Sequence, residues 1–287
     1  MNKEKIAILV DSCCDVPKEF VKQYGMYVIP LKIIYKNHEY LDGVDITPQE
    51  IYQGLKEEIP KTSLPSGETI IEIFDKIKAD GYEKVIAVTL SSGLSGTNNM
   101  VNLLANDYEG LDFFVLDTKN IAIGGGYHVI QAGRYIEAGM GFEEIQERLL
   151  KDVKKCKIFF VVSTLEYLQK GGRIGLVASL FGNALNLKPI ISCNDDGIYY
   201  TVNKVRGRKQ SISKTIDLAL RYAQGHKRYN VAICNGDAAE EAEVIKKEIL
   251  PKLTGMDLYV EGQVSPALGV HTGPGAIGIA IQILNED

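Results

Sequence analysis

The sequence predicts an α/β protein with two domains. Residues 1–157 are expected to form a three-layer α/β/α domain with a mostly parallel sheet, and residues 158–287 a two-layer α/β domain with a mixed sheet. The length of 287 residues and the hydrophobic content of 45% suffice for more than one core. Apolar β-rich runs alternate with helical segments in the first half, which is typical of a parallel sheet covered on both faces. The pattern changes near residue 157, where we expect the second domain to begin.

The first half opens with a β/α unit. Ile6–Val10 is a short buried strand, a turn follows at Asp11 and Ser12, and a helix begins at Pro17. Thr47 and Glu50 form a capping box at the start of a later helix. The other elements expected here are a hairpin over 28–35 and 39–40, helices over 47–58, 68–79, 120–138 and 142–155, and strands over 85–90 and 113–116. A further strand, over 158–162, begins the second half.

The second half contains a strong hairpin signal. Asp195, Asp196 and Gly197 separate two strand-like runs, over 190–193 and 198–205. The remaining expected elements are an apolar helix over 176–185, helices over 211–224 and 238–250, strands over 231–234 and 258–260, and a final apolar strand over 276–284.

Residues 89–97, TLSSGLSGT, join a strand to a helix and are rich in hydroxyls. The unpaired N–H groups of a first helical turn and the positive end of the helix dipole attract anions. The stretch has no lysine and does not match the phosphate-binding Gly-x4-Gly-Lys-Ser/Thr pattern, which disfavours a nucleoside triphosphate. A carboxylate or a single phosphate suits it better, although Ser and Thr also serve simply as helix caps.

A second hydroxyl-rich loop, over 61–66, precedes the helix at 68–79. Ligands of parallel α/β sheets bind where the carboxyl ends of the strands meet. We therefore expect Asp11 and Ser12, Thr62 and Ser63, and the serines of 91–95 to gather in one crevice.

A glycine-rich turn over 269–278 carries His271 and Thr272. A histidine in such a turn can donate a hydrogen bond to an anion. The alternative is a packing role, in which His271 bonds a backbone carbonyl.

Composition excludes several classes of protein. The net charge of −5 and the absence of a long basic stretch argue against nucleic-acid binding. The N-terminus has no signal peptide and no run reaches transmembrane length, so we expect a cytoplasmic protein. The five cysteines have no metal-ligand spacing and indicate reduced thiols, not a disulfide framework or a zinc site.

Several motifs together resemble the DegV family, the bacterial fatty-acid-binding proteins that present acyl chains to a separate fatty acid kinase subunit. The resemblance spans nearly the whole chain. It is carried by VDSCCDVP, the DG-x-D-I-T run at 42–47, KTSLPS, LSSGLSGT, LQKGGRIG, LNLKPII, the R-x-R of VRGRK, and HTGPGAIG.

The resemblance implies a long-chain fatty acid, such as palmitate, bound between the two domains, with no cofactor and no metal. Its carboxylate would be held by Thr62, Ser63, Ser95, His271 and Thr272. An arginine after the hairpin would serve the kinase partner; Arg206 fits, and Arg208 remains an alternative because Gly207 stands where the family more often has a hydroxyl residue. A lipid carrier of this kind also allows transient contact with a membrane.

The apolar segment 176–185 and Phe159–Phe160 are candidates for the acyl slot, and core packing explains them equally well. The competing hypothesis is an enzyme, a serine hydrolase or acyltransferase that uses Ser91, Ser92 or Ser95 with His271 as the base. Against it, the Gly-x-Ser-x-Gly elbow of such hydrolases is missing from this loop.

Overall fold

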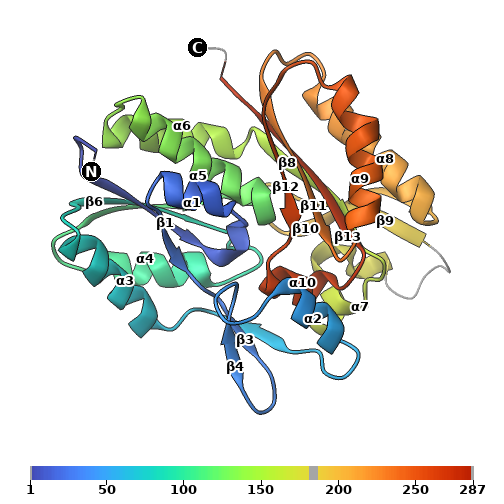
Figure 1. Ribbon diagram of the computed structural model, residues 1–287, viewed down its shortest axis with the longest axis horizontal. Helices are drawn as coiled ribbons and strands as arrows, with labels where there is room; N and C mark the ends of the chain where they lie inside the picture. The colour runs from blue at the N-terminus through green and yellow to red at the C-terminus, as the bar shows by residue number, and fades with distance from the viewer. Residues whose placement is uncertain (1, 181–186, 286–287) are drawn as a thin grey trace.

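The computed structural model describes residues 2–180 and 187–285, and within them it contains two large sheets, a small third sheet and flanking helices (Figure 1). The predicted α/β class is confirmed, with a four-stranded parallel sheet and a six-stranded mixed sheet. In these ranges no helix is both long and apolar enough to cross a membrane.

The parallel sheet is covered by helices on both faces, which gives the predicted three-layer α/β/α arrangement. Its strands, in spatial order, are β2 (Tyr27–Ile29), β1 (Ile6–Asp11), β6 (Lys84–Thr89) and β7 (Asp112–Asp117). One face packs on α1 (Lys18–Gln23), α5 (Ala122–Glu137) and α6 (Phe142–Val153), and the other on α3 (Gly67–Ala79) and α4 (Thr97–Asp107). The alternation of side chains along a strand explains this, because Ile6 and Ile8 contribute to the first face and Ala7 and Leu9 to the second.

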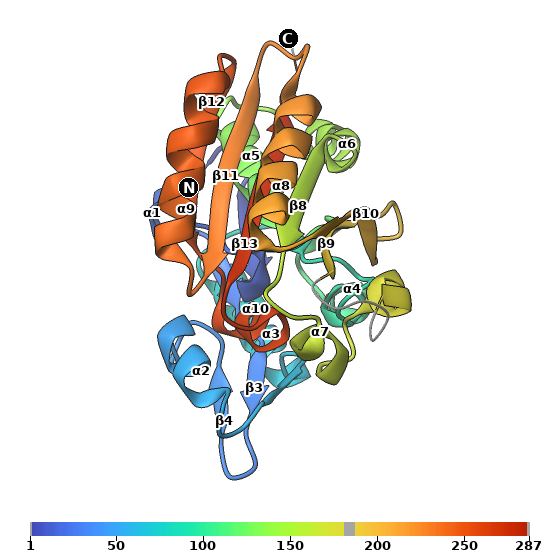
Figure 2. The same ribbon diagram turned by 90° about the vertical axis from the view of Figure 1, so that its right-hand side faces the viewer.

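The mixed sheet has two helices on its outer face, and its inner face packs against a helix of the other half. Its strands, in spatial order, are β10 (Tyr199–Arg206), β9 (Leu187–Cys193), β8 (Cys156–Val161), β13 (Ala276–Ile283), β11 (Tyr229–Gly236) and β12 (Met256–Gln263). Among these, β11 and β12 pair in parallel and the other neighbours are antiparallel. Helices α8 (Arg208–Ala223) and α9 (Ala239–Ile249) pack on the outer face (Figure 2).

The predicted hairpin does leave the main sheet, but it is smaller than expected. It consists of β3 (Lys32–Ile34) and β4 (Glu39–Leu41), while Val28 belongs to β2 of the parallel sheet. The predicted loop at 61–66 begins as a strand, β5 (Lys61–Ser63), because its backbone pairs with β3. The predicted capping box is confirmed at the start of α2 (Pro48–Gly54), which ends earlier than the predicted residue 58, at a glycine that favours termination.

Two further predictions need correction. The first four residues of the turn predicted over 269–278 belong to a helix, α10 (Pro266–Thr272). Pro266 starts this helix at its first position, and Gly273, with φ of +66°, ends it. The apolar helix predicted over 176–185 is a 3-10 helix over Gly175–Leu180, and the rest of that range lies outside the described residues. The remaining short helices are η1 (Ser12–Cys14), α7 (Glu166–Lys170) and η3 (Leu250–Lys252).

Helix α5 lies between the two large sheets (Figure 1). Tyr127 and Ile130 pack in a cluster with Phe160 and Ala280 of the mixed sheet, while Val129 belongs to the core of the parallel sheet. The division at residue 157 stays a prediction, since this helix contributes to both cores.

The turn between β9 and β10 contacts the serine-rich loop of the other half. Ser91 Oγ donates to the carbonyl oxygen of Gly197 at 2.8 Å. Gly93 approaches the same turn so closely that a Cβ atom would lie 2.8 Å from the carbonyl oxygens of Asp196 and Gly197. The two loops can therefore meet only with glycine at this position.

We predict that Gly93→Ala lowers the free energy of unfolding by about 1–3 kcal/mol, the usual cost of an overpacked contact. Urea unfolding of the variant measures it. Gly262→Ala in β12, where a Cβ atom meets nothing within 4 Å, is the matched control and should stay within about 0.5 kcal/mol of the original protein. Equal stability of both variants would contradict the close contact.

Candidate functional site

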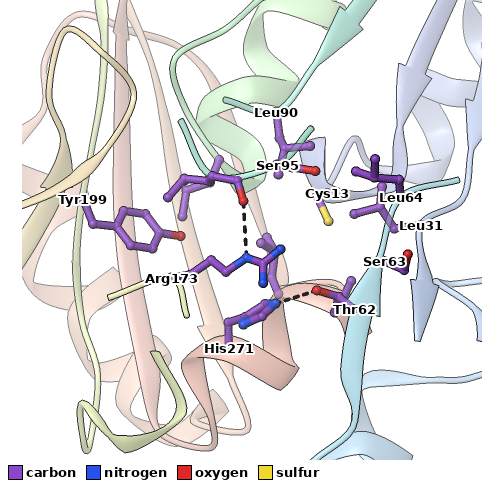
Figure 3. A pocket seen from close by; sticks show the side chains of 14 residues that line it. Cys13, Leu31, Thr62, Ser63, Leu64, Leu90, Ser95, Arg173, Tyr199 and His271 are labelled. Atoms are coloured by element: carbon purple, nitrogen blue, oxygen red, sulfur yellow. Dashed lines mark hydrogen bonds between the residues drawn. The ribbon is translucent and has the colours of Figure 1, made fainter. Parts of the chain in front are cut away.

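A cavity of about 190 Å³ lies where both halves of the molecule meet (Figure 3). Strand β5, the loop after β6, α10 and the segment after α7 each contribute side chains to it. Four predicted site residues line the cavity: Thr62, Ser63, Ser95 and His271. The rest of the lining is mostly apolar and consists of Cys13, Leu31, Leu64, Leu90, Leu94, Ile121, Arg173, Tyr199, Ala267 and Leu268.

Thr62 and His271 form a hydrogen bond across the cavity wall. Thr62 Oγ1 lies 2.7 Å from Nε2 of His271, although the two residues are 209 positions apart in the chain. Pairing of β5 with β3 presents the threonine, and the last turn of α10 presents the histidine. The pair therefore joins the two halves at the cavity.

The other ring nitrogen of His271 fixes the direction of this bond. Nδ1 is buried without a hydrogen-bond partner and faces Gly171, where a Cβ atom would lie 2.0 Å away. An orphaned buried N–H is rarer than an under-used acceptor, so we assign the proton to Nε2. His271 then donates to Thr62 Oγ1, and the threonine hydroxyl is free to donate to a ligand.

Burial, with a smaller contribution from the charge of Arg173, lowers the pKa of His271 from 6.5 to about 4. The imidazole is therefore neutral near pH 7. It serves the site as a hydrogen-bond donor and adds no positive charge.

Ser95 lies on the opposite side of the cavity, at the start of α4. Its Oγ accepts from the backbone N–H of Thr97 at 3.3 Å and lies 2.8 Å from Thr97 Oγ1. Ser95 precedes Gly96, the N-cap residue of α4, so it bonds the first N–H group of the helix without being its cap, and it also lines the cavity. When Thr97 donates to it, the Ser95 proton remains available to an anion.

Sequence reasoning missed Arg173, which is the one cationic side chain in the described cavity lining. Its Nη1 donates to the carbonyl oxygen of Gly171 at 2.8 Å. Its Nε donates to the carbonyl oxygen of Leu94 at 3.4 Å (Figure 3). A guanidinium has five N–H groups, so further donors remain for a ligand. The sequence signal for this residue is the LQKGGRIG motif, which contains Arg173 but does not by itself indicate what the arginine binds.

Other predicted residues lie elsewhere. Thr272 is buried outside the cavity lining, and its Oγ1 donates to the carbonyl oxygen of Leu268 within α10. Asp11 accepts from the backbone N–H groups of Cys13 and Leu90, and Ser12 donates to Asp42, so both support the backbone behind the cavity. Cys13 is the residue of that loop that lines the cavity.

The two phenylalanines considered for the acyl slot belong to different apolar clusters. Phe159 packs on the outer face of the mixed sheet against Tyr222, and Phe160 packs against Tyr199. Neither phenylalanine lines the cavity, although Tyr199 does.

The three candidate nucleophilic serines have other hydrogen-bond partners. Ser91 Oγ donates to Gly197, Ser92 Oγ accepts from Lys119, and Ser95 pairs with Thr97. His271 Nε2 is bonded to Thr62. A nucleophile and its base are recognised by their mutual hydrogen bond, which this arrangement does not supply. Across the described ranges, no group of His, Cys, Asp and Glu side chains is arranged to hold a metal ion.

The two arginines after the hairpin differ in their surroundings. Arg206, the last residue of β10, is exposed, whereas Arg208 forms two hydrogen bonds with Glu241, from Nε at 3.1 Å and from Nη2 at 2.7 Å. Gly207 between them has φ of +81°, which turns the chain sharply into α8. Arg208 is thus committed to the fold, and Arg206 is accessible to a partner.

Together these groups suit an amphiphilic anion. Hydroxyls and a guanidinium provide donors for a small anionic head group, and five leucines line the same space. A buried anion needs such partners to offset its lost hydration.

Comparisons with known proteins agree with this interpretation. The family model described as an uncharacterised protein of the DegV family matches residues 5–283. A DegV domain-containing protein of Clostridium acetobutylicum is 41% identical, over 97% of this chain and 99% of its own. Another, of Clostridium perfringens, is 42% identical over the same shares.

Solved structures that are similar to this chain are described as fatty-acid-binding proteins. A DegV family protein from Thermus thermophilus, described by its fatty acid binding, superimposes with a TM-score of 0.92 at 28% identity, covering 99% of this chain and 100% of its own. DegV of Bacillus subtilis, described as a fatty acid binding protein, gives 0.90 at 26% identity and the same coverage. A stearic acid-binding protein from Eubacterium ventriosum gives 0.88 at 30% identity, covering 97% of this chain and 98% of its own.

The lowered pKa of His271 predicts a specific pH dependence of stability. Between pH 6.5 and pH 4 the unfolded chain binds a proton on this residue that the folded protein does not. Stability should therefore be lost as pH falls through this window, by up to about 1.4 kcal/mol per pH unit from this group.

His271→Gln should remove this contribution and retain a donor for Thr62. Urea unfolding of both ligand-free proteins across the window measures the difference. Burial raises the pKa of Asp11 to about 7, which acts in the opposite direction, but it is common to both proteins and cancels. Parallel stability curves for the two proteins would contradict a buried neutral histidine.

Proposed function

Since the chain belongs to the DegV family, we propose that it binds a long-chain fatty acid between its two halves and presents the carboxylate to a separate kinase subunit for acyl-phosphate formation. One observation carries the proposal. The bonded pair of Thr62 and His271, with Ser95 and Arg173 beside it, faces a leucine-lined cavity in a chain whose structural relatives are described as fatty-acid-binding.

The head group is held by donors of two kinds. The hydroxyls of Thr62 and Ser95 donate hydrogen bonds, and the guanidinium of Arg173 supplies the opposite charge. His271 acts through Thr62, because its Nε2 bonds the threonine and its Nδ1 is covered by Gly171. Ser63, which is exposed at the cavity, contributes a further hydroxyl.

The acyl tail provides most of the affinity in this proposal, because each buried CH2 group contributes about 0.8 kcal/mol. The cavity of about 190 Å³ is smaller than the 300–1,000 Å³ typical of ligand pockets. A long tail therefore also needs space in the apolar cluster behind it, which includes Cys13, Ile121, Leu268 and Tyr199 of the cavity wall.

Phosphoryl transfer is assigned to the partner. In the reaction a carboxylate oxygen attacks the terminal phosphorus of a nucleoside triphosphate, the acyl phosphate forms, and the nucleoside diphosphate leaves. The loop over 89–97 has no lysine to hold a triphosphate, and no serine there is paired with His271. This chain then acts as a carrier without turnover of its own, and exposed Arg206 is its contact with the kinase.

Native mass spectrometry of the purified protein tests the proposal directly. We expect an added mass that corresponds to a long-chain fatty acid and disappears after lipid extraction. A protein that neither retains nor takes up such an acid, or that cleaves acyl esters instead, would overturn the proposed function.

We predict that Thr62→Val and Ser95→Ala each weaken binding of palmitate by roughly 10- to 150-fold, since a hydrogen bond to a charged group contributes about 1.5–3 kcal/mol. Binding of methyl palmitate, which has no charge, should change much less. Titration calorimetry with both ligands measures the ratio. Thr272→Val is the matched control, because that hydroxyl bonds Leu268 and should leave the ratio unchanged.

We predict that Arg206→Ala keeps normal affinity for palmitate but slows phosphorylation by an added kinase subunit at least several-fold. An exposed arginine steers and orients a partner. Arg208→Ala serves as the comparison, because it breaks the contact with Glu241 and should lower stability more than it slows the kinase. Loss of palmitate from Arg206→Ala without kinase would place this residue in the lipid site instead.

A further inference from the structure

Two carboxyl groups from the N-terminal half hold the start of α10. Asp42 Oδ1 accepts from the backbone N–H of Ala267 at 2.9 Å, and Asp15 Oδ1 accepts from that of Ser265 at 3.1 Å. The first N–H groups of a helix have no partner within the helix, and a carboxyl group is favoured there by the helix dipole. Helix α10 is therefore attached at its first turn to the opposite half of the molecule.

Asp42 is the better anchored of the two. Its side chain is 2% exposed, and its Oδ2 accepts from Ser12 Oγ at 2.6 Å. Its backbone N–H donates to the carbonyl oxygen of Leu31 at 2.8 Å, and Ser12 Oγ in turn accepts from the N–H of Leu31. By contrast, Oδ2 of Asp15 is buried without a hydrogen-bond partner.

These contacts close a ring that begins and ends at the cavity. Asp42 directly follows β4, which pairs with β3, and β3 pairs with β5, which carries Thr62. From Asp42 the ring continues through Ala267 along α10 to His271, which bonds Thr62. Helix α10 has seven residues, all buried, so a shift at Ala267 is transmitted to His271 one turn later.

We propose that Asp42 is a positioning residue for the head-group site: by holding the first turn of α10, it sets the distance between His271 and Thr62. It does not line the cavity and does not touch the ligand. The inference rests on the proposed function for the identity of the ligand, but the geometry it explains exists without one.

The ring also explains why a carboxyl group occupies this buried position. Burial raises the pKa of Asp42, and the bonds from Ser12 and Ala267 oppose that rise. An apolar residue would avoid the cost of burial but would leave the N–H of Ala267 without an acceptor.

The test compares variants of the full chain in binding palmitate and methyl palmitate. Asp42→Ala removes the acceptor, Asp42→Ser keeps a hydroxyl that is too short to reach Ala267, and Asp42→Asn keeps a carbonyl oxygen in place. Asp152→Asn is the matched control. This buried acid accepts a hydrogen bond from Tyr135 on the face of the parallel sheet that packs on α5 and α6, and it does not line the cavity.

We expect Asp42→Ala and Asp42→Ser to lose at least about tenfold in affinity for palmitate, the loss expected when a hydrogen bond to a charged group is weakened. Methyl palmitate should lose little, and Asp42→Asn should restore the original ratio. In a Thr62→Val background, Asp42→Ala should change the ratio hardly at all, because the bond it positions is already gone. Equal losses for acid and ester, or a full effect in the Thr62→Val background, would overturn the inference.

A second readout needs no ligand. Nuclear magnetic resonance titration of the His271 ring should give a pKa of about 4 in the original protein and a value closer to 6.5 in Asp42→Ala and Asp42→Ser, as the ring loses its buried position. The Asp152→Asn control should keep the original value. An unchanged titration in both Asp42 variants would overturn the positioning role, whereas failure of the original protein to bind palmitate would overturn the proposed function alone.

Discussion

Buried polar groups at the seam between the two halves are the constraint on which the arrangement of the molecule depends. Ser91 bonds Gly197, Thr62 bonds His271, and Asp42 bonds Ala267, in each case across the seam. A buried polar group that loses its partner costs about 1–3 kcal/mol. A relative shift of the halves would break several such bonds together, so the seam selects one mutual orientation and with it one shape of the cavity.

This seam also determines the charge that the cavity can accept. His271 is neutral near pH 7, and among the described lining residues the single positive charge is that of Arg173. Hydroxyls such as those of Thr62 and Ser95 bind an anion without adding charge. A head group with one negative charge therefore leaves the site close to neutral.

Much of this was accessible from the sequence, because it depends on local patterns. The junction at 89–97, the capping box at Thr47 and the separate hairpin follow from turn chemistry and periodicity, and the structure has all three. Four of the five predicted lipid-contacting residues line the cavity. Long-range contacts were not accessible: nothing near Arg173 or Gly171 in the chain signals that His271 packs beside them. The helix at 266–272 was missed because glycines dominate the residues that follow it, whereas its start depends on Asp15 and Asp42 far away.

The placement of α5 has a consequence for how a ligand would enter and leave the cavity. Tyr127 and Ile130 of this helix pack against the mixed sheet, and other side chains of the same helix pack against the parallel sheet. Wide separation of the halves would therefore expose large apolar side chains of the helix to water. At about 25 cal/mol for each Å² exposed, that opening is expensive beside small local rearrangements. Exchange of a ligand with the cavity is therefore expected to proceed by displacement of individual leucines while the helix stays in place, and its rate should follow side-chain mobility more closely than domain motion.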